Sequence, residues 1–228
     1  MQGAQLTAQG PTAGGVIEIG APLQQIAPDA VVAGSVLIDA ASVVDASATL
    51  AGDGGAIGVG AQVAGGLTSI AGELRSDGAG VDGQGGTVQV TGDAVRARSG
   101  ALLQASGPAG GGSVLVGGSW QNSDPNVAQS TTTLVETGAS LRADATRSGA
   151  GGEVVAWSDV SNPDGWTIAR GYFSAQGGSE GGDGGRIETS GYWLNVLGAT
   201  GSVGSTFGDA GTWLFDPYDI EIVAGNAA

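Results

Sequence analysis

Three residue types are missing from this chain, and each absence excludes a kind of chemistry. The sequence contains no cysteine, no histidine and no lysine. Without cysteine there is neither a disulfide framework nor a thiol nucleophile. Without histidine the chain lacks the commonest general base and the commonest zinc ligand together. The cationic side chains are seven arginines, scattered between Arg75 and Arg186.

Positive charge is also scarce relative to negative charge. There are 22 acidic residues against seven basic ones, which gives a net charge of −15 and an isoelectric point near 4.1. A surface of this sign repels phosphate groups, so we expect neither nucleic acid nor an anionic membrane as a partner. No stretch has the length of a membrane span, and the amino terminus has neither the basic region nor the apolar core of a signal peptide. The acidic surface is typical of a β protein that must avoid aggregation.

The chain does contain one pattern many times. The pattern is an apolar residue, a spacer and a small residue, then a Gly-Gly pair followed by two apolar or threonine positions separated by one residue. It is clearest at 139–189, where two copies follow each other. The first anchors of the seven copies, 29 to 38 residues apart, are Leu6, Val44, Leu74, Leu103, Leu141, Phe173 and Val203. In the last copy the Gly-Gly pair is replaced by Ala210-Gly211. Such a series indicates a solenoid.

Within each copy the apolar residues alternate, as they do in short strands. Val88 and Val90 share one face with Gln89 on the other, and the same period buries Ile187 and exposes Glu188. A further apolar pair often follows, at Val36/Ile38, Val95/Ala97, Trp166/Ile168 and Leu194/Val196. The 46 glycines disfavour a helical solenoid. We therefore predict an all-β fold, a parallel β-helix of about seven three-stranded coils that forms a single segment over residues 1–228.

Equivalent residues of successive coils should lie above one another. Val88, Val114, Val154 and Ile187 are expected to point inward and to form one stacked column of the core. Differences in length between copies must appear as loops at fixed corners. We expect two loops to project, one at 119–133 and one at 158–165 with Asn162-Pro163-Asp164-Gly165 as a turn. Such loops are the places where function is attached to a repeat scaffold.

Carboxylates are the remaining candidates for catalysis or metal binding. They are Asp77, Asp82, Asp144, Asp183 and Glu188. Three of these aspartates lie in glycine-rich turns, where aspartate is favoured for turn formation alone. We therefore predict no catalytic residue and no cofactor. The turn at 177–189 has some likeness to calcium-binding nonapeptide repeats, but it lacks their second aspartate and their tandem nine-residue period, so a weak surface calcium site stays only an alternative.

Two tryptophans lie near the longest loops. Trp120 and Trp166 are the candidates for contact with host or matrix glycans, because exposed indole rings stack on sugars. The alternative is that they cover the ends of the apolar core. Trp213 favours this alternative, because it falls on an inward position and indicates that the tube admits an indole ring.

Three runs of the sequence carry a family resemblance. They are GGEVVAWSD at 151–159, FSAQGGSEGGDGGRIETSGYWLNV at 173–196 and GTWLFDPYDIEI at 211–222. They resemble the repeat-rich passenger of filamentous-haemagglutinin-like exoproteins, which Gram-negative bacteria secrete by the two-partner route. The likeness covers about residues 85–222, and Thr212–Ile222 is its most specific part. It implies a right-handed β-helix that is exported to the cell surface and serves in adhesion, and that engages an outer-membrane transporter only through regions not seen in this sequence.

These observations predict a non-enzymatic structural or adhesive segment of a large secreted protein at the bacterial cell surface. We expect it to be an interior length of a longer filament, whose uncapped ends pair with neighbouring coils or with further copies of the chain end to end. Two alternatives are a carbohydrate-active β-helix enzyme and a small self-assembling solenoid. An ice-binding solenoid would need a threonine ladder, which the single cluster Thr131–Thr133 does not provide.

Overall fold

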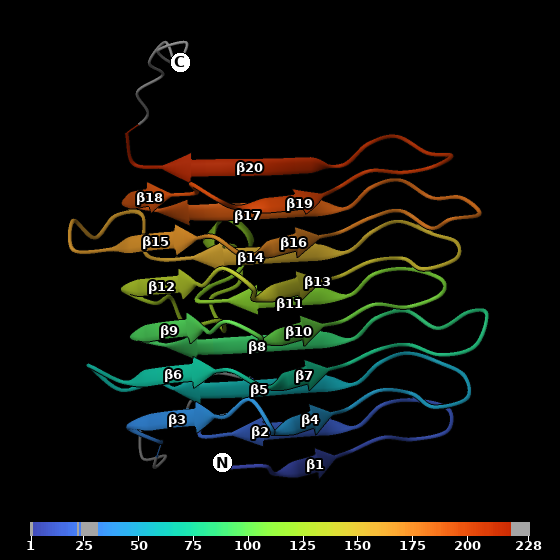
Figure 1. Cartoon of the computed structure of the whole chain (residues 1–228), viewed down its shortest axis with the longest axis horizontal. Coiled ribbons are helices and arrows are strands. Elements are labelled where there is room, and N and C mark those ends of the chain that lie inside the picture. Colours follow the sequence, from blue (N-terminus) through green and yellow to red (C-terminus); the bar gives the residue numbers. More distant parts are fainter. Residues whose placement is uncertain (1, 22, 24–31, 220–228) are drawn as a thin grey trace.

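The strands of the chain stack into one column of parallel coils. The structure, a computed structural model, describes residues 2–21, 23 and 32–219. In this part of the chain 20 strands form three parallel sheets, and each of the first six coils contributes one strand to each sheet in turn. The amino-terminal coil lies at one end of the column and β20 at the other (Figure 1). The predicted all-β parallel β-helix with three strands per coil is confirmed.

Two of the sheets have seven strands and the third has six. Sheet 1 consists of β1 (Gln5–Thr7), β4 (Val43–Asp45), β7 (Glu73–Arg75), β10 (Leu102–Gln104), β13 (Ser140–Arg142), β16 (Tyr172–Ser174) and β19 (Thr200–Ser202). Sheet 2 consists of β2 (Val16–Ile19), β5 (Ala56–Ala61), β8 (Thr87–Gly92), β11 (Ser113–Val116), β14 (Glu153–Trp157), β17 (Arg186–Gly191) and β20 (Thr212–Pro217). Sheet 3 consists of β3 (Ser35–Ile38), β6 (Leu67–Ile70), β9 (Ala94–Ala97), β12 (Thr132–Val135), β15 (Trp166–Ala169) and β18 (Trp193–Asn195).

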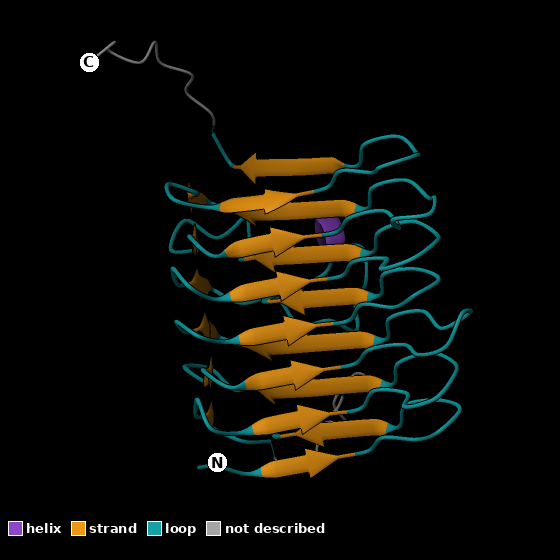
Figure 2. Cartoon of the chain, turned by 45° about the vertical axis from the view of Figure 1, so that its right-hand side comes forward, coloured by secondary structure: helices purple, strands orange, loops and turns teal. Residues whose placement is uncertain are grey.

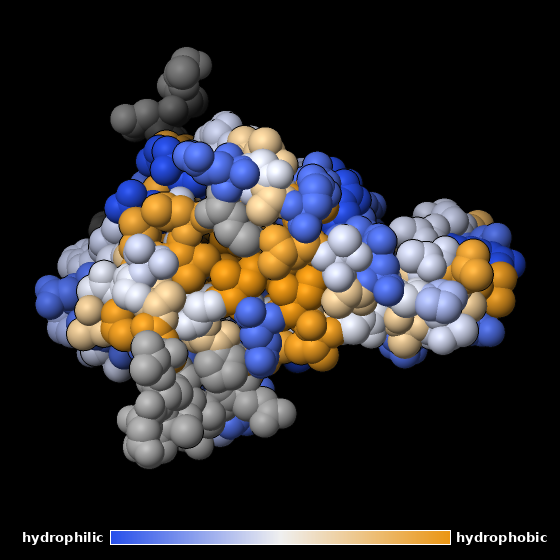
Figure 3. Space-filling view, turned by 90° about the horizontal axis from the view of Figure 1, so that it is seen from below, coloured by the Kyte–Doolittle hydropathy of each residue, from blue (hydrophilic) through white to orange (hydrophobic). Residues whose placement is uncertain are grey.

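Inward-facing residues form continuous columns along the axis. Val88, Val114, Val154 and Ile187 pair in register and are all fully buried, so they lie in one column of sheet 2. Leu74, Leu103, Leu141 and Phe173 do the same in sheet 1. Viewed from the amino-terminal end, the apolar residues gather at the centre of the cross-section (Figure 3). The core is therefore a single apolar rod, stabilised by the stacking of like residues.

The Gly-Gly pairs close the turn between sheets 1 and 2. In each coil the N–H of the second residue of the pair donates to the carbonyl of the small residue after the sheet 1 strand, as Gly112 does to Ala105 at 2.8 Å. The same bond is made by Gly15, Gly55, Gly86, Gly152, Gly185 and Gly211. The long loops that carry these pairs lie along one side of the column (Figure 2). The repeated small residue and Gly-Gly pair are thus the two ends of one hydrogen-bonded corner.

The register of the seventh copy differs from the prediction. In sheet 1 the partner of Phe173 is Gly201, so Val203 takes the place of the small residue and is not the apolar anchor. The indole ring of Trp213 occupies the space that Gly201 leaves, 5.6 Å from the ring of Phe173. A large side chain from the column of sheet 2 thus fills the space next to the glycine in the column of sheet 1.

The inward pair of β15 also lies one residue away from the predicted register. Thr167 and Ala169 are fully buried, whereas Trp166 and Ile168 face outward. The buried threonines of sheet 3 are all hydrogen-bonded: Thr68 donates to the Thr91 carbonyl at 2.7 Å, Thr133 to the Trp157 carbonyl at 2.6 Å and Thr167 to Ser158 Oγ at 2.9 Å. An inward row that contains hydroxyl groups does not show as an apolar alternation, which is why the predicted register is wrong here.

The loop predicted at 119–133 is exposed over residues 121–126 and is anchored by Val127, which is buried. It leaves the coil after β11, forms the short 3-10 helix η1 (Trp120–Asn122) and lies against the outer face of sheet 2 (Figure 2). There a second apolar cluster, the outer cluster, combines Leu115, Val127, Val155 and Trp157 with partly buried Trp120 and Val160. The predicted turn at Asn162–Gly165 is present, with Gly165 N–H donating to the Asn162 carbonyl at 2.8 Å. The outer cluster holds both loops to the column.

Two burial assignments on sheet 2 are wrong, and the loop explains one of them, that of Glu188. Glu188 and Gln89 were expected to be exposed on the outer face of sheet 2, but Glu188 is completely buried and Gln89 is 5% exposed. Glu188 lies beneath the loop, where the backbone N–H of Gln121 donates to Glu188 Oε2 at 2.7 Å. Among the described residues no helix is long and apolar enough to span a membrane. Residues 220–222, which end the most specific part of the family resemblance, lie outside the described residues.

Candidate binding groove

A groove runs along the column at the corner where the Gly-Gly pairs stack. It has a volume of about 800 Å³, and its floor is formed by the glycine pairs of successive coils from Gly85 to Gly211. Because glycine has no side chain, the backbone itself is the floor, except at the last coil, where Ala210 replaces the first glycine. The groove crosses five coils, and with strands about 4.8 Å apart it is roughly 20 Å long. Its length and openness fit an extended chain rather than a compact ligand.

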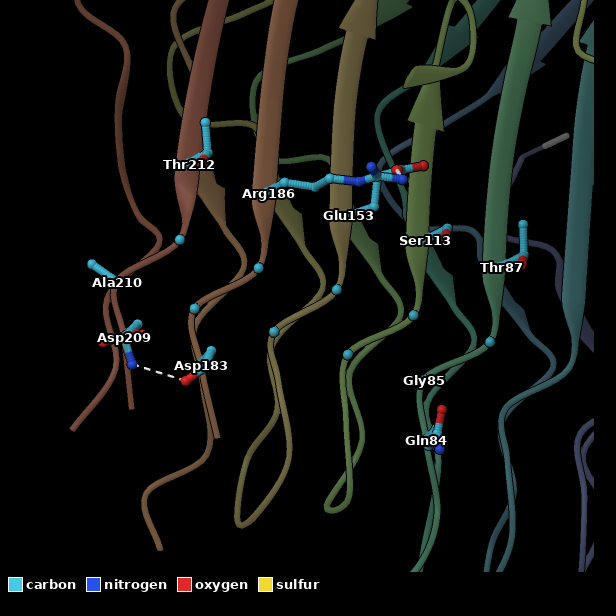
Figure 4. A pocket seen from close by; sticks show the side chains of 18 residues that line it. Gln84, Gly85, Thr87, Ser113, Glu153, Asp183, Arg186, Asp209, Ala210 and Thr212 are labelled. Atoms are coloured by element: carbon cyan, nitrogen blue, oxygen red, sulfur yellow. Dashed lines mark hydrogen bonds and ion pairs between the residues drawn. The ribbon is translucent and has the colours of Figure 1, made fainter. Parts of the chain in front are cut away.

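Polar side chains form the two walls of the groove. One wall is the first residue of each sheet 2 strand, stacked in register as Thr87, Ser113, Glu153, Arg186 and Thr212. The other wall comes from the turns just before the glycine pairs and contains Gln84, Asp183 and Asp209. Figure 4 shows the two rows on opposite sides of the glycines. The site offers hydroxyl, amide and carboxylate groups at the regular spacing of the coils.

The groove carries more negative than positive charge. Glu153, Asp183 and Asp209 are acidic, whereas Arg186 is the cationic residue among those lining it. Arg186 forms an ion pair with Glu153, its neighbour in the wall. Polyanionic ligands are therefore disfavoured, and an uncharged polar chain is favoured.

Trp120 does not line the groove but contacts one of the residues that do. The guanidinium of Arg186 sits over the Trp120 ring, 4.4 Å from its centroid, so a side chain of the groove wall contacts the candidate sugar platform directly. Trp120 also packs against the outer cluster. One ring face is thus used within the protein, and the indole helps to fix the position of Arg186.

Trp166 lies on a different face of the molecule. It pairs in register with Trp193 on the outside of sheet 3, and the Trp193 Nε1–H donates to the Pro163 carbonyl at 3.0 Å. Trp193 is 64% exposed. The structure therefore does not bring the two predicted glycan contacts together: Trp120 contacts the groove residue Arg186, and Trp166 lies on sheet 3.

The candidate carboxylates serve mainly to connect neighbouring coils. Asp77 Oδ1 accepts the Ser106 N–H at 2.9 Å, Asp144 Oδ1 accepts the Gln176 N–H at 2.8 Å, and Asp183 Oδ1 accepts the Asp209 N–H at 2.8 Å. Each bond joins a turn to the same turn of the next coil. These contacts support the structural interpretation of the turn aspartates. Asp82 is exposed in the turn at 81–83. Within the described residues no cluster of three or more potential metal ligands is present.

Glu188 is an ionisable residue that is completely buried, on the same strand as Arg186 of the groove wall. It accepts hydrogen bonds from Gln121 N–H and, at 2.8 Å, from the Ser190 hydroxyl. Burial raises the pKa of Glu188 above the usual value, and the carboxylates of Asp216 and Glu153 act in the same direction. The covering residues Gln121 and Asn122 have φ values of 46° and 51°, in the left-handed region that non-glycine residues rarely adopt. The turn that covers the buried Glu188 therefore has a strained backbone at two successive residues.

Lowering the pH from neutral towards about 4.5, the ordinary pKa of a glutamate side chain, is expected to stabilise the protein. Burial raises the pKa of both Glu188 and Asp77, so the folded state holds these protons more tightly than the unfolded state. Their destabilising effect is then fully present above the folded pKa and disappears as the pH falls towards the unfolded value. The pKa of Asp39 is lowered by the Ser42 hydroxyl, so its stabilising effect is lost only below this window. Thermal melts across the pH range measure the effect.

The neutral variant Glu188→Gln isolates one of these groups. It should raise the melting temperature at pH 7.5 by a few degrees and reduce the gain on acidification, because Gln keeps the shape and loses the buried charge. Asp82→Asn, at an exposed aspartate, controls for the general loss of negative charge. Equal behaviour of the two variants would show that burial of Glu188 has no special effect.

Most of the groove was missed when the sequence was considered alone. The wall residues Thr87, Ser113, Glu153, Arg186 and Thr212 were not among the predicted site residues, although each directly follows a Gly-Gly pair or, for Thr212, the equivalent Ala-Gly pair. That position repeats in every copy and is therefore a usable signal, because equivalent positions stack. The contact between Arg186 and Trp120 could not be predicted from the sequence, because the two residues are 66 positions apart in the chain.

The fold and the groove define the class of the molecule, a β-helical solenoid with a polar axial groove. Its structure is similar to that of the HMW1 secretion domain from Haemophilus influenzae, with a TM-score of 0.59 and 23% sequence identity. The alignment covers 89% of this chain and 48% of that one, so this chain spans about half the length of the solved structure. No protein-family model and no curated protein matches the sequence. At this identity the likeness is one of fold.

Proposed function

We propose that this chain is a non-enzymatic structural and adhesive segment of a large secreted bacterial surface protein. In this proposal the stacked coils extend the molecule and display its binding surfaces, and the axial groove binds an extended, uncharged glycan. The observation that supports it best is the groove itself, a polar channel that follows the coil axis for five coils. A pyranose chain has hydroxyl groups along its whole length, and the walls repeat hydroxyl, amide and carboxylate partners for them.

Export by the two-partner route is part of the same proposal. The runs at 151–159, 173–196 and 211–222 resemble filamentous-haemagglutinin-like exoproteins, and the similar solved structure is a secretion domain. Both point to a protein that acts outside the cell. Contact with an outer-membrane transporter would then involve regions of the exported protein beyond this chain.

The enzyme alternative requires converging carboxylates that are free to act on a glycosidic bond. In the groove, Glu153 is paired with Arg186 and Asp183 is held by the Asp209 N–H. These contacts favour binding over hydrolysis. Incubating the protein with a panel of polysaccharides and assaying reducing ends and unsaturated products decides between the two; a product above background would favour the enzyme.

Blocking the groove should remove glycan binding. Ser113 lies at the middle of the polar wall, and Ser113→Tyr would place a phenol ring across the channel. On a glycan array, and then by titration of the best ligand, we expect a loss in affinity of about tenfold or more. The matched control is Thr132→Tyr, which adds the same ring at a half-buried position on sheet 3.

Removing the two tryptophans separately tests which face is used. Trp120→Ala should weaken binding, because it frees Arg186 of the groove wall, whereas Trp166→Ala should leave the affinity unchanged. The opposite order would place the glycan on sheet 3 beside Trp193. An array without any bound glycan would contradict the adhesive part of the proposal and leave the structural part standing.

A further inference from the structure

The first residue of each Gly-Gly pair is pressed against the following coil. A Cβ atom on this residue would overlap the carbonyl oxygen of the small residue in the next coil, as Gly111 would with Ala143. The same overlap occurs for Gly14, Gly54, Gly85, Gly151 and Gly184, with the carbonyls of Ala46, Ser76, Ala105, Ala175 and Val203 respectively. Each of these carbonyls is held in place by the corner hydrogen bond, so it cannot move aside easily. In six coils, therefore, glycine is required because another coil follows.

The seventh coil breaks this rule. Its first position is Ala210, although the corner is built as in the other coils: Gly211 N–H donates to the Val203 carbonyl at 2.8 Å, and the Asp209 carbonyl accepts from Gly184 at 2.8 Å. Ala210 is exposed, and its methyl group points away from the neighbouring coil, to the open side of the stack (Figure 4). The methyl group occupies the space that the next carbonyl would need.

We infer that Ala210 closes this end of the column to a further coil of the same geometry, including the first coil of a second copy of the chain. The end-to-end assembly expected from the repeat pattern is thereby blocked at the β20 end. The approaching coil would bring the Ala8 carbonyl, which is fixed by Gly15 N–H at 2.7 Å as in every other corner. This carbonyl would meet the Ala210 methyl group.

Apart from this methyl group, both ends are suited to stacking. β20 is bonded on one edge to β17, and Phe215 is 42% exposed on it. At the other end of the column Leu6, Ile17 and Ile19 are only partly buried, and apolar residues occupy the centre of the end face (Figure 3). Open strand edges and apolar ends favour association. A steric stop at the corner would therefore act against the association that these ends favour.

Disulfide trapping tests the inference directly, because the chain has no cysteine of its own. Val16 and Thr212 occupy the same register position of sheet 2 at its two ends, so in a head-to-tail stack they would be neighbours. The double variant Val16→Cys/Thr212→Cys is oxidised over a range of concentrations with Ala210, with Ala210→Gly and with Ala210→Val. Intermolecular disulfides are then quantified on denaturing gels. Sedimentation velocity of the same three proteins without the cysteines measures association independently.

We expect the Ala210→Gly protein to form about tenfold more intermolecular disulfide and to sediment with concentration-dependent oligomers. The parent protein and the Ala210→Val variant should both stay monomeric. Position 210 is exposed, so all three proteins should give the same circular-dichroism spectrum and melting temperature. Equal cross-linking with Ala210 and with Ala210→Gly, whether high or low, would overturn the inference. These readouts do not involve glycan, so they are independent of the proposed function.

Discussion

Replacing Gly111 by alanine is expected to destabilise the protein by at least about 2–3 kcal/mol, because the new Cβ would overlap a carbonyl that cannot move. The overlapping atoms are the Ala143 carbonyl oxygen and the Gly152 nitrogen of the next coil. The strain is between coils, since Gly111 is not among the residues with positive φ. In a chain of this size we expect the melting temperature to fall by roughly 5–10 °C, as measured by thermal and urea denaturation.

The adjacent residue provides a matched control. A Cβ at Gly110 would meet its nearest neighbours, the Ala150 carbonyl oxygen and Gln84 Cγ, at 3.6 Å, which is ordinary contact. Gly110→Ala should therefore be neutral, or stabilising by up to about 1 kcal/mol through the lower entropy of the unfolded chain. If Gly111→Ala is as stable as Gly110→Ala, the coils do not stack as closely as described, and the steric stop at Ala210 is also contradicted.

Introducing a charge into the core column is expected to have the largest effect. Val114 is completely buried between Val88 and Val154, and Val114→Asp would leave a carboxylate there without a partner. Removing such a charge from water without compensation costs about 3–5 kcal/mol, and protonation of the aspartate limits the effect only partly. We expect loss of cooperative unfolding at neutral pH, or a much lower urea midpoint.

Val16 is the matched control for this substitution. It lies on β2 of the same sheet, but its side chain is 64% exposed. Val16→Asp changes the same residue type to the same charge and should alter the stability by no more than about 0.5 kcal/mol. A Val114→Asp protein that melts like the Val16→Asp protein would mean that the inward column is assigned to the wrong residues.

The groove and the stop at Ala210 have a common physical origin. Glycine is required at each corner so that the coils can approach, and the lack of side chains there opens a channel along the outside of the column. The groove and the close stacking of the coils are therefore both consequences of the repeated Gly-Gly pair. Variation at the residue after the pair changes the groove wall without disturbing the stack.

The repeat pattern alone determined the strand period, the three strands per coil and the stacked column from Val88 to Ile187. These features depend on alternation within a strand and on the same short sequence returning in each coil, and both can be read locally. The sequence alone also predicted the turn at Asn162–Gly165 and the structural role of the turn aspartates, because both depend on a few neighbouring residues.

Only the tertiary structure decided the burial of Glu188, the contact of Arg186 with Trp120 and the exchange between Gly201 and Trp213. Gln121 and Glu188 are 67 residues apart, and no pattern within either segment indicates that one covers the other. The inward threonines of sheet 3 were missed for a similar reason, since the carbonyl groups to which Thr68 and Thr133 donate lie on the next coil. A loop that packs on a sheet is selected by shape and by hydrogen bonds between distant segments, and these arise only when the coils are assembled.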